Sequence, residues 1–285
     1  MRYVRVESVT DLLDASREEG AVLVAGGTDL VVKMRAGLVA PRVLVDISNV
    51  EALRGVFAID GAVEIGAVTP EEDLLASATI RDRLPLLARV LSVLGSVQIR
   101  NRGTLGGNLV NASPAADSAV PLLCYDADVV LTGAHGERVL PIASFLLGPG
   151  RTALEPGEFV RAIRVPIPER SVSFFHKVGK RRALTIAIAS VGAVLRLDGL
   201  QIREARIAAG SVAPVPLRLD AVERLLIDAE PTDALIDEAR RTASAAVAPI
   251  SDVRASADYR RSVVGDLVAR ALLEAQSAAA VTARS

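Results

Sequence analysis

Hydrophobic and polar positions follow two different periods within residues 1–55. A short apolar run, VLVA, ends at a pair of glycines, and a later run, RVLVDIS, is rich in β-branched residues. Both runs are typical of strands. Between them, apolar residues recur at helical spacing and a glycine follows as a stop signal. These positions are Leu30, Val31, Met34 and Gly37. The pattern predicts a strand–helix–strand unit.

Residues 56–170 begin with an alternating pattern. The stretch VFAIDGAVEIGAV alternates apolar and polar residues on both sides of an Asp-Gly pair, which predicts a hairpin. In TPEEDLLAS we expect Thr69 as the N-cap, Pro70 as the first helical residue and Glu72 as the residue that closes a capping box. The run LPLLARVLSVLGS predicts a second helix, and DADVVLTG and EFVRAIRVPIP predict strands.

Residues 171–285 follow a proline-flanked linker at 166–168. Two strand-like runs turn at an Asp-Gly pair, residues 198–199, and three helical patterns come after them. The helical patterns are LDAVERLLIDA, TDALIDEARRTASAAV and DYRRSVVGDLVARALLEAQ. Strands followed by helices predict an α+β unit. We therefore expect three units, which end near residues 55, 170 and 285.

The charge balance narrows the range of partners. The 285 residues include 33 basic and 34 acidic side chains, aromatic residues make up 3%, and tryptophan is absent. We therefore expect no nucleic acid as partner. The chain has no apolar stretch long enough to span a membrane, and MRYVRVESVTDLL lacks the apolar region of a signal peptide. We expect a cytoplasmic protein, with association with the inner face of the membrane left open.

Cysteine and histidine offer little chemistry. Cys124 is the only cysteine, so it can form no internal disulfide and cannot by itself hold an iron–sulfur cluster or a structural zinc ion. Its apolar surroundings predict a buried small hydrophobe. The two histidines, His135 and His176, lie far apart in sequence, and His135 falls in an expected turn. We expect no metal site and no catalytic nucleophile–base pair.

The first glycine pair lies where a strand is expected to pass into a helix. Gly26 and Gly27 permit positive φ and close approach, and backbone N–H groups at a helix start can hold an anion. With Thr28, they could therefore surround a phosphate. The alternative is a plain strand–turn–helix connection. The chain contains no Gly-x-Gly-x-x-Gly and no P-loop, so an ordinary dinucleotide or mononucleotide loop is excluded.

The second glycine pair lies in RGTLGGNLVNASPAADSAVPLL, which is dense in small hydrogen-bonding residues. We expect a second strand–helix transition here, with side-chain donors from Thr104 and Asn108 and the amides of Gly106 and Gly107 directed at phosphate oxygens. Asp117 suits the hydroxyls of a polyol better than a phosphate. The alternative is a turn-rich loop. Two such loops about 80 residues apart suggest one ligand held from both sides.

AGGTDL followed by TLGGNLVNASPAADSAVPLL resembles the FAD-binding subunit of the molybdenum hydroxylases. That family includes the medium subunit of aerobic carbon monoxide dehydrogenase and the flavin portion of xanthine dehydrogenase. The resemblance implies an α+β fold, with a two-part FAD-binding domain of the vanillyl-alcohol-oxidase type followed by a smaller α+β C-terminal domain.

The resemblance also implies which residues contact FAD. The first pyrophosphate loop would be Ala25, Gly26, Gly27, Thr28, Asp29 and Leu30, and the second would be Thr104, Gly106, Gly107 and Asn108. Asp117 would contact the ribityl or diphosphate region, Val160 the adenine or flavin, and Lys177 the flavin ring. The alternative for Lys177 is a surface lysine beside a strand. Leu94 falls where xanthine dehydrogenase has an aromatic residue, so an aliphatic contact is expected.

By the same resemblance the chain is an electron-transfer subunit. It would pass electrons from [2Fe–2S] clusters on a small partner subunit to NAD, oxygen or a quinone, with molybdopterin on a large partner subunit. The assembly would be a dimer of heterotrimers. Two other functions stay open from the residues: a free-standing NAD(P)H-dependent flavin reductase of the same fold, and a non-catalytic docking module.

Overall fold

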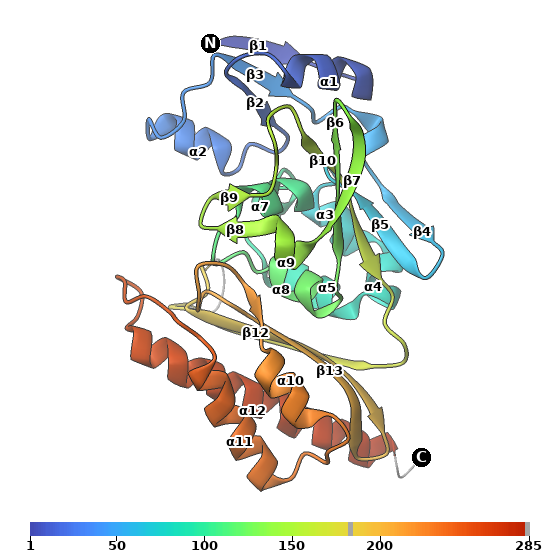
Figure 1. The fold of residues 1–285 in the computed structure, drawn as a ribbon, viewed down its shortest axis with the longest axis vertical. Helices are drawn as coiled ribbons and strands as arrows, with labels where there is room; N and C mark the ends of the chain where they lie inside the picture. Colours follow the sequence, from blue (N-terminus) through green and yellow to red (C-terminus); the bar gives the residue numbers. More distant parts are fainter. Residues whose placement is uncertain (182–184, 283–285) are drawn as a thin grey trace.

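The computed structural model describes residues 1–181 and 185–282, and three large sheets follow one another along its long axis (Figure 1). The first is three-stranded and parallel, in the order β1-β3-β2. Its elements are β1 (Arg2–Arg5), α1 (Val9–Ser16), β2 (Ala21–Val24), α2 (Leu30–Arg35) and β3 (Val43–Asp46). The strand–helix–strand unit that the apolar pattern predicts is therefore confirmed as β2–α2–β3. Buried Leu12, Val45 and Leu53 form the centre of its core.

The second sheet is five-stranded, in the order β4-β5-β10-β6-β7, with every neighbouring pair antiparallel. Its strands are β4 (Val56–Ile59), β5 (Ala62–Gly66), β6 (Asp128–Gly133), β7 (Gly136–Pro141) and β10 (Phe159–Pro166). The predicted hairpin is confirmed as β4–β5, and the predicted turn at His135 joins β6 to β7. Central β10 contributes Val160, Ile163 and Val165 to the main apolar core, whereas its Arg161 and Arg164 pair with Glu64 of β5.

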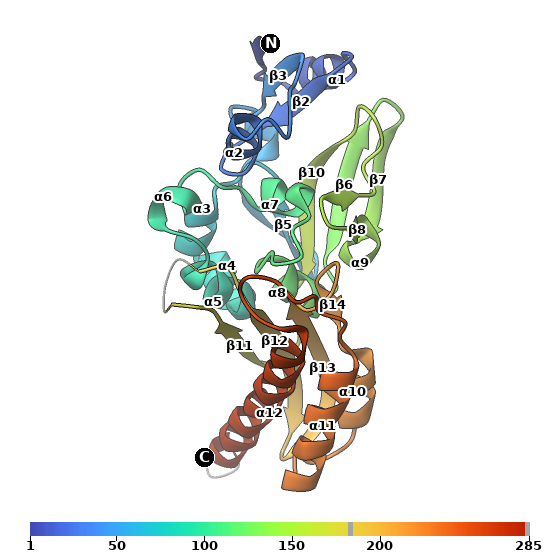
Figure 2. The ribbon, with the colours of Figure 1, turned by 90° about the vertical axis from the view of Figure 1, so that its left-hand side faces the viewer.

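Helices cover one side of this sheet (Figure 2). The helices of this unit are α3 (Glu71–Ala76), α4 (Ala78–Arg83), α5 (Pro85–Val93), α6 (Val97–Arg100), α7 (Leu105–Asn111), α8 (Ala119–Cys124) and α9 (Ile142–Phe145). A small two-stranded ribbon follows them, made of β8 (Leu146–Gly148) and β9 (Arg151–Thr152). The leucine-rich run predicted as a helix is α5, which buries Leu86, Leu87, Val90 and Leu91. Together these helices and the sheet enclose the largest apolar core.

The predicted capping box at the start of α3 is wrong. Pro70 is the N-cap and α3 begins at Glu71, with no side-chain cap. The hydroxyl of Thr69 instead accepts from the Gly55 amide at 2.9 Å and donates to the Gly66 carbonyl at 2.7 Å. Thr69 therefore fastens the helix start to the β4–β5 hairpin. Thr69 thus forms hydrogen bonds with the β4–β5 hairpin and none with the first turn of α3.

The third sheet is four-stranded and antiparallel, in the order β11-β12-β13-β14, and helices cover one face. The elements are β11 (Val172–Val178), β12 (Ala189–Asp198), β13 (Gln201–Gly210), β14 (Leu217–Arg218), α10 (Asp220–Leu226), α11 (Asp233–Ala245) and α12 (Ala257–Thr282). The predicted β12–β13 turn and all three helical patterns are confirmed. Helix α8 packs against β12 and β13, where Cys124 lies fully buried, as expected.

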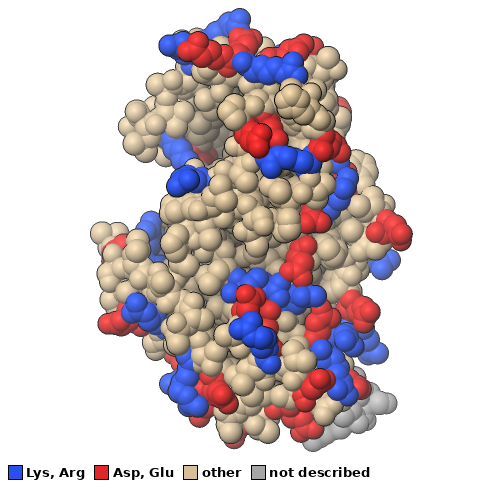
Figure 3. Space-filling view, in the orientation of Figure 1, with Lys and Arg blue, Asp and Glu red and all other residues tan. Residues whose placement is uncertain are grey.

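Charges of both signs are interspersed over the surface, as Figure 3 shows for one face. The same view shows a hollow between the N-terminal part and the rest of the molecule. No helix within residues 1–181 and 185–282 is long and apolar enough to cross a membrane.

Candidate functional site

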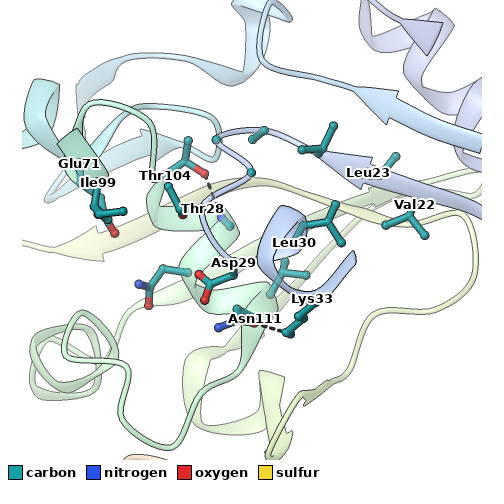
Figure 4. A pocket seen from close by; sticks show the side chains of 18 of the residues that line it. Val22, Leu23, Thr28, Asp29, Leu30, Lys33, Glu71, Ile99, Thr104 and Asn111 are labelled. Atoms are coloured by element: carbon teal, nitrogen blue, oxygen red, sulfur yellow. Dashed lines mark hydrogen bonds between the residues drawn. The ribbon is translucent and has the colours of Figure 1, made fainter. Parts of the chain in front are cut away.

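A cavity of about 230 Å³ lies between the end of β2, the helices α3 and α6, and the start of α7. Figure 4 shows its wall, and Figure 2 shows that α2 lies above α7 in the molecule. The two glycine segments that are about 80 residues apart in sequence meet here. The fold thereby brings them together as the sequence predicts.

Glycine is required where the first segment turns into the cavity. A Cβ on Gly26 would lie 1.7 Å from the carbonyl oxygen of Arg102, so the two segments touch through backbone. Gly27 has φ of +73°, a conformation that costs other residues about 1–2 kcal/mol. These glycines are what allows the loop to fold back against the segment before α7.

The amides of residues 26 to 30 are the main donors of this loop. None of these consecutive N–H groups donates to an acceptor in the described part of the chain. They line the cavity at the start of α2, whose first turn has no side-chain cap. Unpaired consecutive amides of this kind form a concave site for an anion such as a phosphate.

The second glycine pair has a different local structure from the expected one. Helix α6 precedes it, and the pair lies in the first turn of α7, so no strand leads into it. The Gly107 amide donates to the Thr104 hydroxyl at 3.1 Å and the Gly106 amide to the Ala67 carbonyl at 3.1 Å. The expectation that both amides face a phosphate is therefore wrong. Gly106 serves packing, because its Cβ would lie 2.7 Å from Ala67.

Side-chain donors complete the cavity wall. The carboxamide oxygen of Asn108 accepts from Ser118 at 2.9 Å, which leaves its NH₂ group to face a ligand. The Lys33 ammonium donates to Asn111 at 2.5 Å, as the dashed line in Figure 4 marks. An ammonium has three donors, so Lys33 keeps two for a bound group. Both features favour an anionic ligand.

One buried acid also lines the cavity. Glu71, the first residue of α3, is 1% exposed. Burial is the main cause that raises the pKa of its carboxyl to about 7, the Asp29 charge adds to the rise, and Arg100 opposes it. Glu71 is thus shifted toward its protonated form near neutral pH, in contrast to an ordinary surface glutamate.

The structure brings most of the predicted contacts into this one wall. Among the residues that line the cavity are Ala25, Gly26, Gly27, Thr28, Asp29, Leu30, Leu94, Thr104, Gly107 and Asn108. Leu94 is 7% exposed and, with Ile99, gives the wall an apolar portion next to its polar one. Gly106, Asp117, Val160 and Lys177 do not line it.

Asp117 and Lys177 form an ion pair with each other, so both are engaged within the chain. Their side chains are 8% and 10% exposed, and the alternative of a surface lysine is therefore wrong. Burial raises the pKa of Asp117 and the Lys177 charge opposes that rise. The pair joins the segment before α8 to β11. Val160, in β10, belongs to the main apolar core.

Sequence reasoning missed several residues of the wall, above all Lys33, Glu71 and Asn111. The sequence could have predicted the place of Lys33 in the wall, because Lys33 lies one helical turn after Asp29 and so faces the same side as the glycine loop. It could not have predicted the place of Glu71, because a Glu in the first turn of a helix is common whether or not a ligand is near. Within the described residues, no group of three or more His, Cys, Asp or Glu could hold a metal ion.

Two family models match the chain. Residues 1–168 match the FAD-binding domain in molybdopterin dehydrogenase, and residues 174–275 match the CO dehydrogenase flavoprotein C-terminal domain. The carbon monoxide dehydrogenase medium chain of Hydrogenophaga pseudoflava is 35% identical over 88% of each chain. The xanthine dehydrogenase FAD-binding subunit of Escherichia coli O157:H7 is 33% identical over 97% of this chain and 96% of its own.

Solved structures agree with these similarities. The carbon monoxide dehydrogenase of Hydrogenophaga pseudoflava superimposes with a TM-score of 0.93 at 34% identity, over 98% of both chains. Quinoline 2-oxidoreductase from Pseudomonas putida 86 gives the same TM-score at 26% identity. Both the α+β fold and the FAD-binding domain that the sequence motifs imply are therefore confirmed. The chain belongs to the family of FAD-binding medium subunits of the molybdenum hydroxylases.

Proposed function

We propose that the cavity wall holds the FAD of an electron-transferring medium subunit. The observation that carries this proposal is the run of unpaired amides at residues 26 to 30, next to the Lys33 ammonium. Together they suit the diphosphate of a dinucleotide. The apolar portion at Leu94 and Ile99 suits a ring system.

The other residues act around this centre. The Asn108 amide donates to the cofactor, and Thr104 keeps α7 in place as its N-cap. The Asp117–Lys177 pair and Val160 do not line the cavity wall, and their predicted contacts with FAD stay predictions. When bound, FAD supplies the two-electron chemistry of the subunit, and the chain supplies binding, orientation and electrostatics.

Membership of the family supports the following proposal for the partners. A large subunit carries molybdopterin, a small subunit carries [2Fe–2S] clusters, and the assembly is a dimer of heterotrimers. Electrons leave to NAD, oxygen or a quinone.

The single cysteine, buried and unpaired, supports a reducing compartment such as the cytoplasm. The units 1–55, 56–170 and 171–285 each contain the whole of one large sheet, which supports treating them as separate domains.

Purification tests this function directly. The chain produced alone should bind FAD and turn yellow, yet reduce no substrate with NAD(P)H. Produced together with its two partner chains, it should co-purify with both and carry electrons to an acceptor. Turnover by the chain alone would favour the free-standing flavin reductase. A folded, colourless chain that does not bind added FAD would favour the docking module.

A further inference from the structure

The side chain of Glu71 occupies a prepared position in the cavity wall. Its backbone N–H donates to the Gly103 carbonyl at 2.9 Å, which holds the start of α3 against the second glycine segment. A Cβ on Gly103 would lie 3.0 Å from the Glu71 Oε2, so the missing side chain at 103 makes room for the carboxyl. Figure 4 shows Glu71 beside Ile99, on the same wall as Thr104.

Only 1% of Glu71 is exposed, and no hydrogen bond within the described residues is among the causes that set the pKa of its carboxyl. The charge of Arg100 compensates Glu71 in part, but its Nε donates to Glu72 at 2.6 Å and its NH1 to the Leu94 carbonyl at 3.0 Å. Asp29 adds a second negative charge from the opposite loop. An ionised Glu71 is therefore poorly stabilised here.

The other charged groups on the surrounding elements are engaged or exposed. Asp73 pairs with Arg54, Arg81 donates to the Leu75 and Ala76 carbonyls, Arg89 donates to the Ser173 carbonyl, Lys33 donates to Asn111, and Asp82, Arg83 and Arg102 are exposed. Burial and Asp29 together raise the pKa of Glu71 to about 7. A cofactor diphosphate would add further negative charge and raise that pKa again.

We infer that Glu71 binds FAD as a protonated acid, so that its O–H donates to an oxygen of the cofactor and FAD binding takes up one proton from solvent at pH values above neutrality. This inference rests on the proposed FAD site. It makes affinity for the cofactor dependent on pH through one residue. A carboxylate at the same position would repel the diphosphate, whereas the neutral acid is a donor.

The sign of the pH dependence follows from linkage. Well below pH 7, Glu71 is already protonated in the free protein, so the FAD dissociation constant is flat. Between the pKa of the free protein and the higher pKa of the complex, the dissociation constant rises with pH by up to about tenfold per pH unit. Titration of apoprotein with FAD across this range measures the slope.

Variants on α3 distinguish the effect of the Glu71 charge on FAD affinity from the effect of its packing. Glu71→Gln keeps a donor and loses the titration, so its dissociation constant should stay flat and match that of the wild type at low pH. Glu71→Leu keeps the bulk without a donor, so it should bind FAD more weakly than Glu71→Gln at every pH and with an equally flat profile. Asp73→Asn, an exposed site on the same helix, should keep the wild-type profile.

Calorimetry gives a second readout. In buffers of different protonation enthalpy above pH 7, the wild type should take up as much as one proton per FAD, and Glu71→Gln none. A wild-type protein whose affinity for FAD is independent of pH would overturn this inference alone, as would a Glu71→Gln variant with the wild-type slope. If the folded wild type binds no FAD at any pH, the proposed function fails and takes this inference with it.

Discussion

Gly27 and Gly37 show how one residue type serves two purposes on either side of α2. Gly27 lines the cavity at φ of +73°, and Gly37 ends the helix at φ of +70° with nothing near its missing Cβ. The backbone requirement is the same at both sites. Only one of them is a requirement of binding.

Alanine at either position should therefore cost a similar amount of stability, about 1–2 kcal/mol from the left-handed backbone. Gly27→Ala should in addition lose FAD, because its new methyl group meets Val31 at 3.2 Å and shifts the amides of the loop. Denaturant unfolding and the flavin-to-protein absorbance ratio measure the two effects. Equal flavin content in both variants would show that the loop does not bind the cofactor.

Lys33 supplies the cationic side chain of the cavity wall that sequence reasoning missed. Lys33→Met keeps the length of the side chain and removes its charge. Hydrogen bonds to charged groups contribute about 1.5–3 kcal/mol, so affinity for FAD should fall about ten- to a hundredfold. Lys180→Met is the matched control, because Lys180 donates to the Val253 carbonyl and lies outside the cavity. Equal dissociation constants for the two variants would contradict the role of Lys33.

At the scale of elements, the Asp117–Lys177 pair connects the segment before α8 with β11. Oδ1 of Asp117 is buried and has no hydrogen-bond partner among the described residues, so Lys177 is the main stabilising contact of this carboxylate. Buried pairs contribute little net stability as such, but breaking one leaves a charge uncompensated. The pair therefore contributes little to the free energy of unfolding, and its main effect is to fix the position of β11 relative to the segment before α8.

Lys177→Met should therefore destabilise the FAD-free protein by about 3–5 kcal/mol at neutral pH. Without the ammonium, burial raises the pKa of Asp117 above its value in the unfolded chain. A raised folded-state pKa means that stability is present at acid pH and is lost as pH rises through that pKa. Asp117→Asn combined with Lys177→Met should recover most of the loss. Urea midpoints at several pH values test this, and a loss independent of pH would contradict it.

The whole molecule is joined where α8 lies on the third sheet. A Cβ on Gly192 of β12 would lie 2.8 Å from Val120, and one on Gly210 of β13 would lie 3.0 Å from the same residue. The Cys124 thiol donates to the Gly192 carbonyl at 3.3 Å, and its burial raises its pKa to about 12. The flavin-binding half and the C-terminal half therefore meet through close backbone packing.

Gly192→Ala should overpack this junction and cost about 1–3 kcal/mol. Val120→Ala leaves a cavity at the same place and should cost about 2 kcal/mol. The double variant should be more stable than the sum of the two losses predicts, by at least about 0.5 kcal/mol, because the new methyl group fills the new cavity. Additive losses in urea unfolding would mean that the two sites do not touch.

The sequence by itself determined the local elements and the family. The periods of apolar residues predicted the β4–β5 hairpin, α5 and the β2–α2–β3 unit correctly, because each depends on neighbours along the chain. The motifs AGGTDL and TLGGN identified the family and most of the residues that line the cavity. Which residues contact FAD stays a prediction.

The tertiary structure decided how polar groups are paired. Thr69 bonds to Gly55 and Gly66 where a capping role was expected, and the Gly106 amide bonds to Ala67 where a ligand was expected. Lys177 likewise forms its ion pair with Asp117, which lies 60 positions away in the sequence. Sequence patterns report burial and local conformation, whereas a buried donor takes whichever acceptor the fold brings to it. The pKa of Glu71 has the same origin, because burial and the charge of Asp29 are set only when distant segments meet.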